Sequence, residues 1–143
     1  ILSLILFGLS INVLNVDGFI VNQNIKRGAN LYNENADESV DSAYLAGLSF
    51  DSIPPLISYY HEDQLPDRLR MEIGGILACR LETLNKPNQT PWTSWHYARS
   101  KAFSQLQTIE QELSDYRVFQ SDDPWGWFAE IGQETIPCSR SWD

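Results

Sequence analysis

Residues 1–14 of the chain are apolar apart from two serines, a glycine and an asparagine. A helix needs about 20 apolar residues to cross a membrane, whereas a helix buried in a protein core needs fewer. The run lacks the basic leader and the small-residue cleavage site of a signal peptide. We therefore expect residues 1–14 to be the end of a transmembrane helix that starts further upstream in a longer protein.

Residues 15–143 have the usual length of one domain, so we expect a single soluble unit after the apolar run. The formal net charge of the chain is −9 and its pI is near 4.5. A surface that binds phosphate groups is basic, so this charge argues against nucleic acid and against anionic lipid headgroups as partners.

The chain has two cysteines, Cys79 and Cys138. They lie too far apart for a redox Cys-x-x-Cys motif, and no second pair is present to complete a zinc site. We therefore expect no metal and no cofactor. Two interpretations stay open for the cysteines. Cys79 lies in an apolar helical stretch and would suit a buried thiol, whereas a disulfide to Cys138 would imply an oxidising compartment.

Caps, prolines and apolar spacing predict a series of helices in the first two thirds of the domain. Asp17 is expected to cap the first helix, over residues 18–31, and a short helix follows over residues 41–48. Pro54 and Pro55 suit the first turn of a third helix, because the amides of that turn have no intrahelical partner. This helix would follow a cap at Asp51 or Ser52 and run to about His61, and another would start at Pro66 and end near Asn85.

The longest apolar stripe begins at Thr90-Pro91 and recurs at spacings of three and four residues. It predicts one long C-terminal helix that ends near Arg117. No segment shows the alternating pattern of a convincing strand. The expected fold is therefore all-α, an array of helical hairpins with one long C-terminal helix, preceded by the end of a transmembrane helix. The stripe consists of Trp92, Trp95, Arg99, Ala102, Leu106, Ile109, Leu113 and Tyr116.

The polar cluster around His61 does not have the spacing of a metal site. His61, Glu62 and Asp63 are adjacent, so on a helix they would point in different directions, and Pro66 separates them from Asp67. The cluster is typical of a polar helix end, where a histidine is favourable.

The candidate binding residues lie together near the start of the expected long helix, and they are Trp92, Trp95, His96 and Arg99. His96 has no recognisable partner for acid–base catalysis, and the sequence contains no nucleophile elbow or phosphate loop, so we expect no catalytic residues. Arg99 is the one charge in an apolar stripe. We expect its guanidinium to stack on an indole or to meet a buried carboxylate, because an unpaired charge there would be costly.

Three blocks of the sequence resemble the C-terminal domain of a family of bacterial multi-pass membrane proteins, the DUF4173/DUF4153 type of domain of unknown function. The first block is Asn15-x-Asp17 followed by Asn24. The second is residues 41–54, DSAYLAGLSFDSIP, and the third is residues 92–99, WTSWHYAR. The resemblance implies a membrane protein, and it implies no activity.

We therefore expect residues 15–143 to be a non-catalytic interaction or assembly domain of a bacterial integral membrane protein. Its expected partners are the membrane, through residues 1–14, and another protein. The alternative is the soluble part of a membrane enzyme or transporter whose active residues lie in upstream helices. Lys26 and Arg27 follow the apolar run closely and favour the cytoplasm. The possible cysteine pair favours the opposite side, and we expect the domain to be extracytoplasmic.

Overall fold

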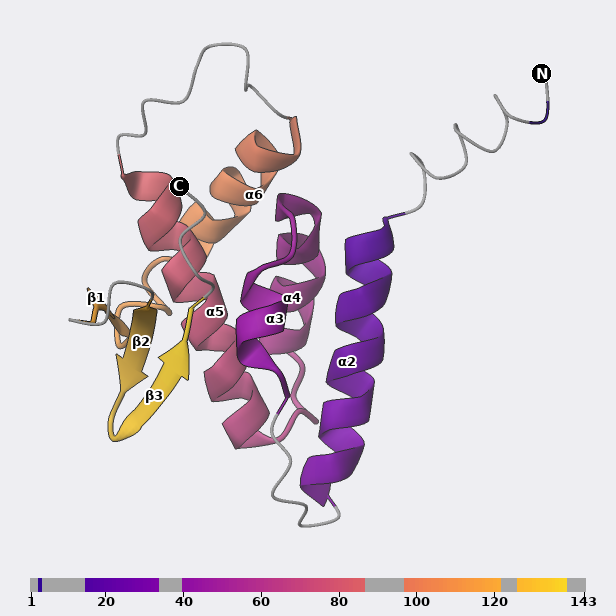
Figure 1. The fold of residues 1–143 in the computed structure, drawn as a ribbon, viewed down its shortest axis with the longest axis horizontal. Helices are drawn as coiled ribbons and strands as arrows, with labels where there is room; N and C mark the ends of the chain where they lie inside the picture. Colours follow the sequence, from indigo (N-terminus) through magenta and orange to yellow (C-terminus); the bar gives the residue numbers. More distant parts are fainter. Residues whose placement is uncertain (1–2, 4–14, 34–39, 87–96, 122–125, 139–143) are drawn as a thin grey trace.

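The computed structural model describes residue 3 and residues 15–33, 40–86, 97–121 and 126–138. Within these ranges helices come first and a small sheet comes last (Figure 1). In chain order the elements are α2 (Val16–Asn33), α3 (Ser42–Ala46), the 3-10 helix η1 (Phe50–Ser52), α4 (Ile53–Tyr60), α5 (Asp67–Asn85), α6 (Tyr97–Thr108), β1 (Arg117–Gln120), β2 (Trp127–Ile131) and β3 (Glu134–Pro137).

Helix α5 is the central element of the described fold. The sheet packs against it on one side, and the other helices lie along the rest of its surface (Figure 1). Every residue from Ile73 to Cys79 is buried, which is typical of a helix that is covered all round. This run of buried residues therefore reflects the position of α5 between the sheet and the other helices.

Two glycines in the middle of α5 allow the sheet side to approach closely. A Cβ atom added at Gly75 would lie 2.5 Å from Cδ1 of Ile136 and 3.0 Å from its Cβ, and Ile136 belongs to β3. A Cβ at Gly74 would collide with the ring of Tyr116. Glycine in a helix interior costs about 1 kcal/mol relative to alanine. The close packing of Ile136 on Gly75 and of Tyr116 on Gly74 accounts for two glycines that helix propensity disfavours.

The C-terminal sheet contradicts the all-α prediction. Its strands are antiparallel in the order β1-β2-β3, and Ala129 of β2 is the register partner of Ile136 of β3. Gly132 makes the turn between β2 and β3 with a φ of 61°. The described strands have four or five residues each, and Ala129 and Ile136 are their buried residues. Strands this short carry too little alternation to be recognised in the sequence.

The predicted long C-terminal helix is also wrong, because α6 ends at Thr108. Residues 109–115 form successive turns, in which the amide of Glu112 donates to the carbonyl of Ile109 at 2.9 Å. The stripe residues Leu106, Ile109 and Leu113 are nevertheless buried. Apolar spacings of three and four residues suit a chain of tight turns as well as an α-helix, so the stripe correctly predicted burial and wrongly predicted helix.

No helix in the described ranges is both long and apolar enough to cross a membrane. The transmembrane segment predicted over residues 1–14 lies, apart from residue 3, outside the described residues. The fold class is therefore corrected to a mostly helical domain that ends in a three-stranded antiparallel sheet, as far as the structure describes the chain.

A disulfide joins Cys79 of α5 to Cys138, the residue that follows β3. The Cα atoms lie 6.0 Å apart, and both residues are buried with Ala129. The amide of Cys138 also donates to the carbonyl of Trp127 at 2.8 Å. Of the two interpretations of the cysteines, the structure selects the disulfide, which fastens the sheet to the central helix.

Candidate functional site

The first block of the family resemblance, Asn15-x-Asp17, connects the start of α2 to the turn before α4. The side-chain oxygen of Asn15 accepts from the amide of Gly18 at 2.7 Å, so Asn15, and not the predicted Asp17, caps the helix. The carboxylate of Asp17 instead accepts from the amide of Ser49 at 2.9 Å. The side-chain amide of Asn15 donates to the carbonyl of Asp51 at 3.2 Å.

The turn at residues 49–55 is organised by its serines and prolines. The hydroxyl of Ser49 accepts from the amide of Asp51 at 3.3 Å and caps η1. Ser52 is fully buried and donates to the carbonyl of Ser49 at 2.7 Å, but its side chain makes no cap hydrogen bond to α4. Pro54 and Pro55 occupy the first turn of α4, as the sequence predicted.

The ring of Phe50 lies close to the guanidinium groups of two arginines from different helices. The Cζ atoms of Arg80, from α5, and Arg99, from α6, lie 5.7 Å and 6.0 Å from its ring centroid. These distances fit cation–π contacts, which gain strength when water is excluded. We call this group of Asn15, Asp17, Phe50, Arg80 and Arg99 the α2–η1 junction.

Arg80 is the more enclosed arginine of the α2–η1 junction. Its guanidinium donates to the carbonyl of Leu48, while its Nε has no hydrogen-bond partner among the described residues. Burial lowers the pKa of Arg80 below its ordinary value, and the carboxylate of Asp17 acts in the opposite direction. The arginine therefore holds the η1 turn against α5 through one backbone bond and one aromatic contact.

Of the four candidate binding residues, Arg99 lies within the described residues. Arg99 is half-buried, and its Cζ atom lies 6.0 Å from the ring centroid of Phe50. Trp92, Trp95 and His96 lie outside the described residues. The sequence missed Phe50 as the partner because it lies almost fifty positions from Arg99, and no local spacing connects the two.

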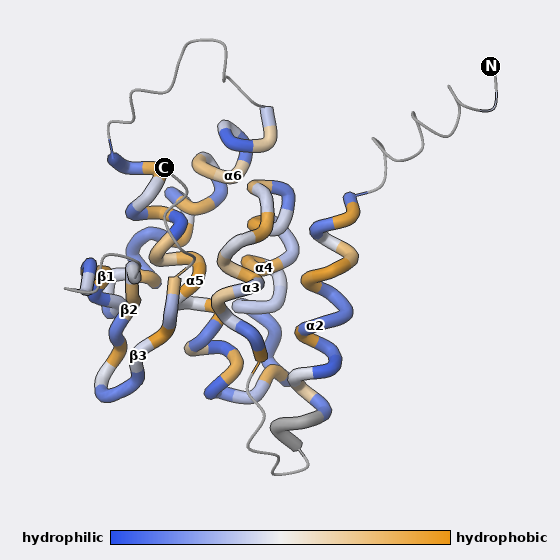
Figure 2. Tube along the Cα trace, in the orientation of Figure 1, coloured by the Kyte–Doolittle hydropathy of each residue, from blue (hydrophilic) through white to orange (hydrophobic). Residues whose placement is uncertain are grey.

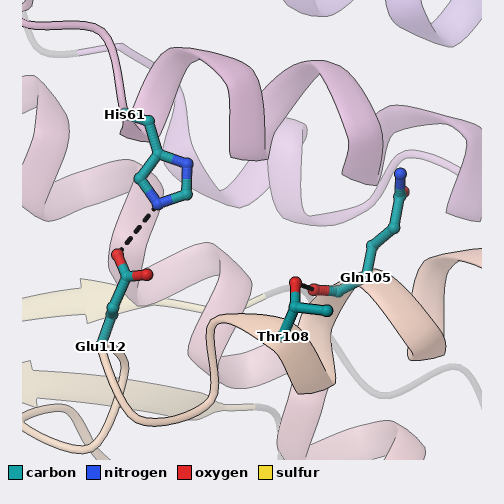
Figure 3. A network of polar contacts seen from close by, with 4 residues as sticks. All are labelled: His61, Gln105, Thr108 and Glu112. Atoms are coloured by element: carbon teal, nitrogen blue, oxygen red, sulfur yellow. Dashed lines mark hydrogen bonds and ion pairs between the residues drawn. The ribbon is translucent and has the colours of Figure 1, made fainter.

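His61 ends α4 and forms an ion pair with Glu112, with 2.9 Å between Nε2 and Oε2 (Figure 3). Both side chains are about half exposed, so water screens the pair and it contributes little to stability. In the ranges that the structure describes, no group of three or more histidines, cysteines and carboxylates converges as a metal would require. The interpretation of His61 as a polar helix end fits this geometry.

A cleft of about 420 Å³ opens between α3, α5 and β3. Its apolar walls are made by Val40, Met71 and Pro137, and its polar groups include Ser42 and Glu72. The sequence did not reveal this cleft, because three segments that are far apart in the chain form it together. Its full lining is Val40, Asp41, Ser42, Ala43, Arg68, Met71, Glu72, Glu134, Thr135, Ile136 and Pro137.

Residues 1–59 match the model of the family described as domain of unknown function (DUF4153). This confirms the resemblance drawn from the sequence for the first two of its three blocks. The match ends inside α4, so α5, α6 and the sheet lie beyond it. Comparison with curated proteins and with solved structures gives no match.

Proposed function

We propose that this protein is a non-catalytic interaction domain that works at a membrane, with residues 1–14 as its lipid contact. The family match assigns a domain of unknown function and no activity. The polar groups of the α2–η1 junction bond mainly to backbone groups of neighbouring segments. These bonds to backbone groups support a structural role for the junction, which is to hold α2 in place.

The observation that carries the proposal is the exposed apolar start of α2. Val16 and Phe19 are 50% and 62% exposed, and they lie within five residues of the end of the apolar run. The tube in Figure 2 is hydrophobic in colour at the start of α2. Apolar side chains at this position would extend the lipid contact of residues 1–14 into the folded domain. Full burial of a phenylalanine side chain is worth about 1.5–3 kcal/mol.

We assign the domain to the extracytoplasmic side of a bacterial membrane. The Cys79–Cys138 disulfide supports this side, because disulfides persist in oxidising compartments and are rare in the cytosol. Lys26 and Arg27 are exposed on α2 and would favour the cytoplasm. However, long domains are translocated largely regardless of such charges.

The test is flotation of the full chain with vesicles of neutral phosphatidylcholine, which removes attraction to charged headgroups. We expect the wild-type chain to float, and Phe19→Ser to lower its partition coefficient about tenfold, because the loss is comparable to one partly buried phenylalanine. The matched control is Tyr97→Ser, which removes an aromatic side chain that is 72% exposed at the start of α6. Equal flotation of all three proteins would refute the role of α2, and no flotation of the wild type would refute the membrane contact.

A further inference from the structure

We propose that the cleft between α3, α5 and β3 binds a basic segment of a partner polypeptide by accepting a lysine or arginine side chain. The inference rests on the proposed role of the domain in interaction, and it names the chemistry of the partner. The evidence for this binding site is the shape of the cleft, its charge and its fixed walls.

The charge of the cleft favours a cation. Its lining contains three carboxylates, those of Asp41, Glu72 and Glu134, against the single guanidinium of Arg68. Asp41 is exposed and its carboxylate also caps α3, accepting from the amide of Tyr44 at 2.8 Å. Glu134 is exposed, whereas the side chain of Glu72 is only 12% exposed. The net charge of −9 on the whole chain would add long-range attraction for a basic partner.

The deeper carboxylate is held in place by its neighbours. The hydroxyl of Ser42, itself buried, donates to Oε2 of Glu72 at 3.3 Å. Nε of Arg68, one turn earlier on α5, lies 3.8 Å from Oε1 of the same carboxylate. Glu72 is thus oriented by two elements, α3 and α5. An oriented carboxylate spends less ordering entropy when a ligand binds.

The apolar walls fit the stem of a long cationic side chain. Lysine and arginine bury their methylene groups along apolar surface while the charged end stays near polar groups. Val40, Met71 and Pro137 offer such surface beside the carboxylates. The cleft volume, about 420 Å³, falls in the range of ligand-binding sites and leaves room for more than one side chain.

The β3 wall is fixed and is poorly suited to accept an added strand. The next residue after Pro137 is Cys138, and its disulfide to Cys79 ties this end of β3 to α5. Pro137 has no backbone amide to donate to another strand. Recognition through side chains in the cleft is therefore favoured over recognition through backbone pairing along β3.

The test is a titration of the full isotope-labelled chain, in a neutral detergent at low salt, with an acetyl-tetralysine amide peptide. We expect saturable NMR shifts centred on Ser42, Glu72 and Thr135. Glu134→Gln should weaken the apparent Kd roughly fivefold, as expected for an exposed ion pair. The matched control is Glu110→Gln, which removes the same charge at an exposed position in the turns after α6. Because Glu134 is exposed, Glu134→Gln keeps the fold. Glu72 is largely buried, so binding by Glu72→Gln is compared only after a thermal melt shows that this variant is folded.

Two further ligands separate the sources of the signal. A peptide with the same four lysines acetylated should lose binding, and 1,5-diaminopentane should bind much more weakly than the tetralysine peptide. The proposal is overturned if the acetylated peptide binds equally well, if the diamine matches the peptide, or if the control Glu110→Gln weakens binding as much as Glu134→Gln does. Vesicle flotation of Glu134→Gln should equal that of the wild type, so failure of the membrane contact and failure of the cleft are observed separately.

Discussion

Removal of the Cys79–Cys138 disulfide should lower the free energy of unfolding by several kcal/mol. The bridge joins residues 59 positions apart, so it closes a loop of about 60 residues in the unfolded chain. The loop-entropy relation gives about 4 kcal/mol of stabilisation at 25 °C for a loop of that length. The bonded residues are buried and their Cα separation, 6.0 Å, is in the ordinary range, so native contacts can persist after reduction.

The assay is urea unfolding followed by tryptophan fluorescence, with and without a phosphine reductant. With a slope of about 2 kcal/mol per molar urea, a loss of about 4 kcal/mol lowers the midpoint by about 2 M. The control is the double variant Cys79→Ala with Cys138→Ala, whose midpoint should be low and should not respond to the reductant. An identical midpoint for the oxidised and reduced wild type would refute the reasoning, because the bridge would then constrain nothing in the unfolded chain.

Three further perturbations test the core. Leu106→Ala should cost roughly 2–5 kcal/mol, because Leu106 is fully buried, and an unchanged urea midpoint would place the stripe on the surface. Gly75→Ala should destabilise through overpacking by about 1–3 kcal/mol, partly offset by about 1 kcal/mol of helix propensity, and Ile136→Val in the same chain should recover part of the loss in a double-mutant cycle. Burial, then Tyr60 and Asp115, raise the pKa of Tyr116. Above about pH 10 the unfolded state therefore loses the Tyr116 proton while the folded state keeps it, so stability falls as the pH rises. The melting temperature of Tyr116→Phe should fall less steeply with pH in this range than that of the wild type.

Much of the helical part of the fold could be predicted because its signals are local. Pro54 and Pro55 mark the first turn of α4, and the apolar spacing of Leu69, Ile73 and Leu77 identifies a buried face of α5. The burial of Leu106 was likewise predicted from the stripe. Prolines and apolar spacings act on residues within one or two helical turns, so they can be recognised from the sequence alone.

The candidate site could be predicted only in part, since its geometry depends on contacts between distant segments. The sequence singled out Arg99 as a charge that needs a partner, but Phe50 lies beside it only when α6 packs on η1. The cleft at Ser42 and Glu72 has no sequence signature, because β3 supplies one of its walls from more than sixty positions further on.

The sequence by itself determined the starts of α4 and α5 and the burial of Leu106, Ile109 and Leu113. Tertiary structure alone decided that the stripe becomes turns after Thr108, that the tail forms strands, and that Cys79 is bonded to Cys138. Helix signals arise between residues three or four apart, whereas a strand of four residues gains its hydrogen bonds and its burial from other segments. The sheet therefore forms where Ile136 of β3 can cover Gly75 of α5, and that surface exists only in the folded chain.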